Sequence, residues 1–174
     1  MSDAKTNHAK TNKKTAKVVL ERTYRASLEE VWALWTTKEG FESWWGPQGF
    51  RAEVHELDAR VGGALRYDMI ASAPEAIAAM KAMGQPTSHA TKSRFTELVP
   101  RERLVLTNVI DFLPGVAPYE SDIAVELLAS GGRVRMVVTL DGMHNEEFTN
   151  MQKEGCTSQL TKLDERFASG DVPA

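Results

Sequence analysis

The sequence has 174 residues, enough for one ordinary domain with a sizeable core, and its formal net charge of −3 argues against a nucleic-acid-binding or membrane-surface protein. Its single cysteine, Cys156, excludes an internal disulfide and a cysteine-based metal site. No apolar run reaches the roughly 20 residues of a membrane-spanning helix and no secretory signal is apparent, so we expect a cytoplasmic protein without a nucleic-acid or membrane partner.

Residues 1–16 are polar and contain nothing large and apolar to bury. We expect a disordered tail there. The alternative is a basic arm for RNA or membrane, but the lysines of this segment are scattered and lack aromatic or arginine neighbours. Residues 17–170 are expected to form a single domain, with residues 171–174 as a second short tail.

Residues 18–25 alternate and are rich in β-branched side chains, which predicts a first strand. Ser27 and Glu30 then have the spacing of a capping box at a helix start. Apolar residues follow at helical spacing: Leu28, Val31, Trp32 and Trp35.

Thr37 can cap a second short helix, whose aromatic residues Phe41, Trp44 and Trp45 recur at i, i+3 and i+4. Gly46-Pro47 ends this helix because proline lacks the amide donor and restricts the residue before it. The tryptophan pair is interpreted either as a wall around a space or as a large core plug, with Trp45 as the residue partly facing the space.

Six further segments are predicted strands: residues 50–57, 61–70, 90–99, 103–111, 122–128 and 133–141. Gly62-Gly63 falls inside one of them and indicates a bend or bulge. The segment from residue 72 to residue 84 interrupts the strands with a short methionine-bearing helix, expected to be a lid or edge cover. A long helix, capped by Asn145 and ended by Gly170, spans residues 146–169.

This element order predicts an α+β fold in which an antiparallel sheet carries its helices on one face. Several motifs resemble one family, the branch of the START, polyketide-cyclase and pollen-allergen (SRPBCC) superfamily that is like the activator of heat-shock-protein-90 ATPase. They are Trp32 with Trp35, Trp44-Trp45-Gly46-Pro47, Arg60-Val61-Gly62-Gly63, residues 97–105 and residues 155–160. The resemblance implies a helix-grip fold, with a curved seven-stranded antiparallel sheet around the C-terminal helix and a hydrophobic cavity between them.

Two features depart from this family. Cys156 stands where relatives often carry tryptophan, which removes a large group from the helix face that lines the cavity. The segment at residues 72–88 is longer than the tight turn that is common there.

Catalytic motifs are scarce, and the four histidines lack metal-ligand spacing, so neither a metal nor a cofactor is predicted. The strand ends and loops carry a group of polar residues: His89, Asp111, Tyr119, Asp141 and His144. These residues can satisfy loop backbone, orient a ligand, or perform acid–base chemistry, with His89 and His144 as the candidate catalytic residues.

Side chains on the predicted inward faces are either plain core or cavity lining. The candidate cavity residues are Trp45, Phe50, Tyr67, Met69, Met80, His89, Met136, His144, Phe148 and Met151. Arg66, Arg94, Arg133 and Arg135 are assigned to the solvated face.

Three functions remain open from the sequence. The chain binds a small, mostly apolar molecule in the cavity; or it is a cyclase- or hydrolase-like enzyme that uses a histidine at the cavity mouth; or it interacts with a chaperone ATPase. Fold-level analogy alone does not transfer function. A homodimer is compatible with the sequence because an open sheet has edge strands to protect.

Overall fold

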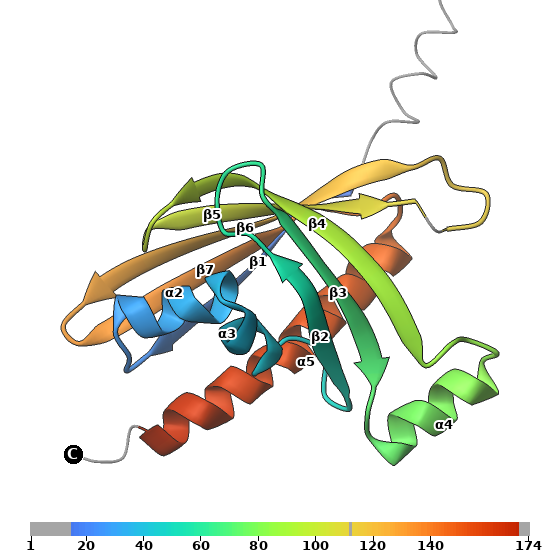
Figure 1. The fold of residues 1–174 in the computed structure, drawn as a ribbon, viewed down its shortest axis with the longest axis horizontal. Helices are drawn as coiled ribbons and strands as arrows, with labels where there is room; N and C mark the ends of the chain where they lie inside the picture. The colour runs from blue at the N-terminus through green and yellow to red at the C-terminus, as the bar shows by residue number, and fades with distance from the viewer. Residues whose placement is uncertain (1–14, 112, 171–174) are drawn as a thin grey trace, which may run out of the picture.

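The computed structural model describes residues 15–111 and 113–170 and shows a curled sheet with a long helix along one side (Figure 1). The elements are β1 (Val18–Tyr24), α2 (Leu28–Thr36), α3 (Lys38–Glu42), β2 (Phe50–Leu57), β3 (Ala64–Ala71), α4 (Pro74–Ala82), β4 (Ser88–Val99), β5 (Arg103–Ile110), β6 (Tyr119–Ser130), β7 (Arg133–Leu140) and α5 (Glu146–Gly170).

The sheet has seven strands in the order β1-β7-β6-β5-β4-β3-β2, and every neighbouring pair is antiparallel. Strands β2 to β7 follow one another in sequence, and β1 closes the order by pairing with β7. The predicted α+β class and helix-grip architecture are confirmed. None of the described helices has the length and apolar character needed to cross a membrane.

Residues 1–14 and 171–174, both predicted as tails, lie outside the described residues. Within the described part, the Thr15 amide donates to the Met143 carbonyl at 3.0 Å, just after β7. The backbones come so close here that a Cβ on Gly142 would lie 1.8 Å from the Thr15 carbonyl oxygen. Only glycine fits at position 142.

The concave face of the sheet supplies most of the core, because alternate residues of each strand point toward α5. On β7 this row is Val134, Met136, Val138 and Leu140, all buried. Leu160, Leu163 and Phe167 of α5 are buried on the facing side. The intervening residues of β7 are exposed or half-buried, as the alternating pattern predicts.

The capping box at Ser27 and Glu30 is confirmed, and it starts α2 at the position that the sequence indicated. Helices α2 and α3 bring their aromatic residues into the core, where Trp35 and Phe41 are fully buried. Thr37 caps α3 through a bond from the Gly40 amide to its hydroxyl.

The Gly62-Gly63 pair lies in the turn before β3, which begins at Ala64, rather than inside the strand as predicted. A Cβ on Gly63 would lie 1.9 Å from the Asp58 carbonyl oxygen. The pair also exchanges backbone hydrogen bonds with Phe95 of β4. The glycines therefore permit a close approach of backbones at this corner of the sheet.

Helix α4 lies at the end of β3 and β4 (Figure 1), and none of its residues is buried. Met83, directly after it, is 62% exposed. The predicted short helix is present in the connection between β3 and β4.

Candidate functional site

A pocket of about 230 Å³ lies between the concave face of the sheet and the first half of α5. We call it the central pocket. Its lining residues are Trp45, Pro47, Tyr67, Met69, Asn108, Ile123, Leu140, Gln152, Gly155, Cys156 and Gln159. They come from the loop after α3, from β3, β5, β6 and β7, and from α5, so segments far apart in the sequence form the walls.

Trp45 forms one wall of the central pocket and is held by aromatic and polar contacts. Its indole Nε1 donates to the Tyr67 hydroxyl at 3.0 Å, and its ring stacks on Phe41 at 4.6 Å between centroids. Trp44 points elsewhere: it is 1% exposed, and its Nε1 donates to the Leu34 carbonyl at 2.9 Å. The two adjacent indoles thus have different positions, one beside the pocket and one in the core.

The loop that carries Trp45 is tied to α5 by a buried hydrogen bond. The Gly46 amide donates to Oε1 of Gln159 at 2.8 Å. Gly46 has a positive φ of 109°, a conformation that favours glycine. This bond sets the position of the loop relative to the helix and hence one dimension of the pocket.

The titratable groups that line the central pocket are kept neutral. Burial raises the pKa of the Cys156 thiol to about 11, which disfavours the nucleophilic thiolate. Burial also raises the pKa of Tyr67. No lining residue is an aspartate, glutamate, lysine, arginine or histidine. The described lining therefore carries no charge.

Two buried polar atoms have no hydrogen-bond partner among the described residues: Oε1 of Gln152 and Oγ of Ser121. Gln152 lines the central pocket, and Ser121 lies opposite Asn108, another lining residue, in the β5–β6 register. Buried polar atoms are nearly always satisfied, so atoms without a partner need an explanation.

The predicted cavity residues fall into several places. Trp45, Tyr67 and Met69 border the central pocket. Met136 does not border it, because it is fully buried in the core, where Trp35 Nε1 lies 3.4 Å from its sulfur. Met151 does not line it either: its side chain is 55% exposed on the outer side of α5.

Two predicted residues lie near α4 rather than at the central pocket. Phe50 is half-buried and borders a shallow depression with Ala73 and Ala76 at the start of α4. Met80 is half-buried on α4 itself.

The candidate catalytic histidines are on separate elements. His89 is half-buried on β4, opposite Met69 in the β3–β4 register. His144 precedes α5, where its Nδ1 lies 2.8 Å from the Tyr119 hydroxyl and its ring lies 4.6 Å from that of Phe148. Neither histidine lines the central pocket.

Cys156 was expected on the helix face that lines the cavity, but the polar residues Gln152, Gln159 and Asn108 were not predicted at the pocket, although the signal was present. Gln152 and Gln159 recur with Cys156 at i, i+4 and i+7 and therefore share one face of α5. Asn108 continues the buried row of Leu104 and Leu106 on β5. Polar residues in an otherwise apolar stripe are the pattern that marks a pocket with hydrogen-bonding groups.

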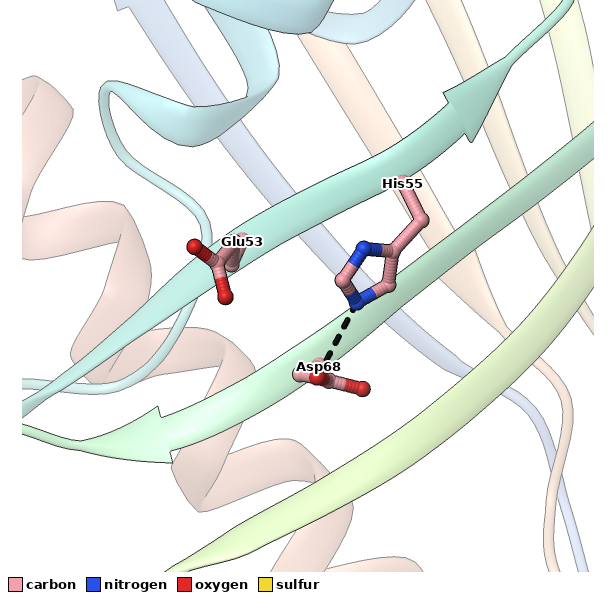
Figure 2. Close-up of side chains that lie close together, drawn as sticks. All are labelled: Glu53, His55 and Asp68. Carbon is pink, nitrogen blue, oxygen red and sulfur yellow. Dashed lines mark hydrogen bonds and ion pairs between the residues drawn. The ribbon is translucent and has the colours of Figure 1, made fainter.

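A second cluster lies on the outer face of β2 and β3, opposite the buried side of Ala52 and Val54 (Figure 2). Glu53, His55 and Asp68 have ligand atoms that all lie within 4.8 Å of one another. The cluster was not predicted from the sequence, because it contains one histidine and the spacing of histidines alone does not indicate it. Residues two apart on a strand share a face.

Chemically, the cluster has the nitrogen and carboxylate donors that divalent transition metals accept. It is nevertheless exposed, and Nε2 of His55 already lies 3.0 Å from Oδ2 of Asp68. Arg66, on the same face, pairs with Glu56 at 3.0 Å. These contacts describe a network of surface polar pairs, and such networks are common without a metal.

Comparison with known proteins places the fold among solved structures. A protein from Chromobacterium violaceum is similar with a TM-score of 0.69 and 25% identity, over 87% of this chain and 96% of that one. The AHSA1 protein from Silicibacter pomeroyi has a TM-score of 0.69 and 20% identity, over 89% and 99%. CalU16 from Micromonospora echinospora has a TM-score of 0.59 and 15% identity, over 86% and 74%.

A search of the curated proteins found no match. The family model described as activator of Hsp90 ATPase homolog 1-like protein matches residues 25–168, nearly all of the described domain. The resemblance seen in the sequence is therefore confirmed, and the chain belongs to the activator of Hsp90 ATPase homolog 1-like family of the START/polyketide-cyclase superfamily.

Proposed function

We propose that this protein binds a small, mostly apolar and uncharged molecule in the central pocket. The observation that carries the proposal is the pocket of about 230 Å³ between the sheet and α5, whose lining is mostly apolar with a few uncharged polar groups. Small-molecule sites are concave and have this kind of lining. The walls beside Trp45 and Tyr67 come from several elements of the fold, which supports a ligand site.

The size of the pocket sets the size of the ligand. An apolar cavity of roughly 150 Å³ accommodates benzene, so a pocket of this volume suits on the order of ten non-hydrogen atoms. The apolar and aromatic lining supplies the binding free energy, and the few polar groups set orientation. Cys156 contributes to this volume, because a larger side chain at that position would fill part of it.

Binding is favoured over catalysis by the chemistry of the lining. Cys156 has a raised pKa, and His89 and His144 do not line the central pocket, so no described residue there is suited to act as a nucleophile or general base. Interaction with a chaperone ATPase rests on the family description alone, whereas ligand binding rests on this chain's own residues.

Toluene is a suitable probe because it is apolar and small enough for the pocket. We expect toluene to shift the amide of Gly155 and the indole signal of Trp45 saturably in ¹H–¹⁵N NMR spectra, with a Kd on the order of 1 mM for its seven carbons. Cys156→Phe, which places a ring in the pocket, should abolish these shifts. Met151→Phe is the matched control, because it makes a similar change on the exposed side of the same helix.

The two variants make the outcome unambiguous once thermal melts show that both are folded. Saturable shifts in the wild type and in Met151→Phe, but not in Cys156→Phe, support binding in the central pocket. Shifts that are equal in all three proteins, or absent from the wild type up to the solubility of toluene, would rule the proposal out.

A further inference from the structure

Some polar groups of the central pocket have a hydrogen-bond partner within the protein, and one does not. The Tyr67 hydroxyl accepts a bond from Trp45, and Oε1 of Gln159 accepts one from the Gly46 amide at 2.8 Å. These groups fix the walls. Oε1 of Gln152 is also buried, yet it has no partner among the described residues.

Ser121, on β6, is a second buried polar residue in this condition. Its side chain is 1% exposed, and its Oγ has no described partner. It pairs with Asn108 across β5 and β6 and shares the inward face of β6 with Ile123, and both of these residues line the pocket. The hydroxyl of Ser93 on β4 donates to Oδ1 of Asn108 from the other side. A row of uncharged polar side chains therefore crosses the concave face at the pocket.

An unpartnered buried acceptor lowers the stability of the empty protein, because it loses its bond to water on folding and gains none in return. The loss is recovered when a ligand donates to it. A carboxamide that faces a pocket can present either an acceptor or a donor, and a serine hydroxyl can present both. Such groups match a ligand hydroxyl or amide.

The electrostatics of the pocket select against ions. None of the lining residues is charged. A ligand carboxylate or ammonium group would therefore lose its hydration on entering the pocket and find no opposite charge there to compensate the loss. The described ion pair on α5, between Arg22 and Asp164, lies in the far half of the helix and does not line the pocket.

We propose that the ligand of the central pocket is a neutral molecule with a ring-sized apolar body and one hydroxyl or primary amide, which donates a hydrogen bond to Oε1 of Gln152. This assignment rests on the proposed binding function and specifies its ligand class. It distinguishes the site from one for fatty acids or other organic anions.

Two pairs of probes test the assignment on the intact protein by NMR titration. 4-Methylphenol differs from toluene by one hydroxyl, and 4-methylbenzamide differs from 4-methylbenzoate by charge at nearly constant shape. We expect 4-methylphenol to bind roughly fivefold more tightly than toluene, the equivalent of one net hydrogen bond. The benzamide should bind at least tenfold more tightly than the benzoate at pH 7.

Gln152→Met keeps the length of the side chain and removes its polar atoms. In this variant the preference for 4-methylphenol over toluene should fall to twofold or less, while toluene itself binds as well as before. Gln85→Met, on an exposed loop residue, is the control and should keep the wild-type preference. The comparison of benzamide with benzoate uses the wild type alone and stays decisive if Gln152→Met fails to fold.

The outcomes separate this inference from the proposed function. If no probe binds, toluene included, the binding function fails and the ligand class fails with it. If toluene binds but the hydroxyl adds nothing, or the benzoate equals the benzamide, the ligand class is wrong and binding stands. An unchanged preference in a folded Gln152→Met protein would also overturn the role of Gln152.

Discussion

The hydroxyl of Tyr24 on β1 donates to Oδ1 of Asp164 on α5 at 2.9 Å, and the Tyr24 ring stacks on Phe167 at 4.7 Å. Arg22 pairs with the same carboxylate at 3.2 Å. These contacts attach the second half of α5 to the edge strand of the sheet. The first half of the helix, which carries Gln152 and Cys156, lies over the central pocket instead. One half of α5 anchors it, and the other half forms the site.

Replacing Asp164 tests this division. Asp164→Ala leaves the buried Tyr24 hydroxyl and the Arg22 guanidinium without their shared acceptor, and we expect a loss of about 2 kcal/mol in the free energy of unfolding. Urea denaturation measures it, with Glu165→Ala at the neighbouring exposed position as control. Toluene affinity should change less than twofold, and a larger change would show that the anchor and the site are not separate.

The stability of the protein should fall at alkaline pH. The pKa of Cys156 is raised by burial from 9.0 to about 11, and burial raises the pKa values of Tyr24 and Tyr67 above their ordinary value of 10.0. Each group is neutral when protonated, and the folded state holds its proton to higher pH than the unfolded state does. Stability is therefore intact below pH 9 and declines as pH rises above it.

The deprotonation of Cys156 should lower the free energy of unfolding by roughly 2–3 kcal/mol between pH 9 and 11. Urea titrations at several pH values measure it, and Cys156→Ala should flatten the curve between pH 9 and 10, whereas the tyrosine contribution above pH 10 remains. A variant whose stability falls as steeply as that of the wild type from pH 9 to 10 would contradict the assigned pKa.

Cys156 also reports on access to the pocket. At pH 8 a thiol with a pKa of about 11 has roughly a hundredth of the thiolate of one with a pKa of 9.0, so alkylation by iodoacetamide should be at least a hundredfold slower than in urea-unfolded protein. Saturating toluene should slow it further. Mass spectrometry gives the rates, and a native rate near that of the unfolded chain would show that the thiol is not buried.

The bond between the Gly46 amide and Gln159 is expected to position Trp45. Gln159→Leu leaves that buried amide without an acceptor, so we expect a loss of about 1–3 kcal/mol in unfolding free energy and weaker toluene binding. Gln48→Leu, which removes an exposed bond to Thr161 from the same loop, is the control. Unchanged toluene affinity in a folded Gln159→Leu protein would show that the bond does not shape the pocket.

The architecture could be predicted from the sequence because its signals are local and agree with one another. The capping box at Ser27, the alternation along β7 and the glycine pair at the corner each indicate one element or turn. Antiparallel strands with short connections leave few ways to pair them. The boundary at Gly62 was misplaced because glycine fits both a strand bulge and a turn.

The site was harder to predict because hydrophobicity was used to choose the inward face of α5. Met151 lies five residues before Cys156, which is not a helical repeat, whereas Gln152 lies four residues before it. Geometry thus favours the polar residue, and the structure places Gln152 at the pocket and Met151 in solvent. A binary pattern of apolar and polar residues fails where a polar side chain lines a pocket.

Met136 illustrates a second reason why the pocket lining could not be predicted from the sequence. Alternation along β7 correctly places it inside, but it cannot say which part of the concave face α5 leaves uncovered. That depends on long-range packing, here the approach of Trp35 from α2 to the Met136 sulfur at 3.4 Å.

Intermolecular nuclear Overhauser effects between 4-methylphenol and the protein test the central claim most directly, because they locate a bound probe by proton contacts. Binding in the central pocket predicts contacts from the probe to the Met69 methyl group, the Trp45 indole and the Ile123 methyl groups, with the phenol end near the Gln152 side-chain amide. Contacts confined to surface residues around α4, or no contacts at saturating probe, would contradict it.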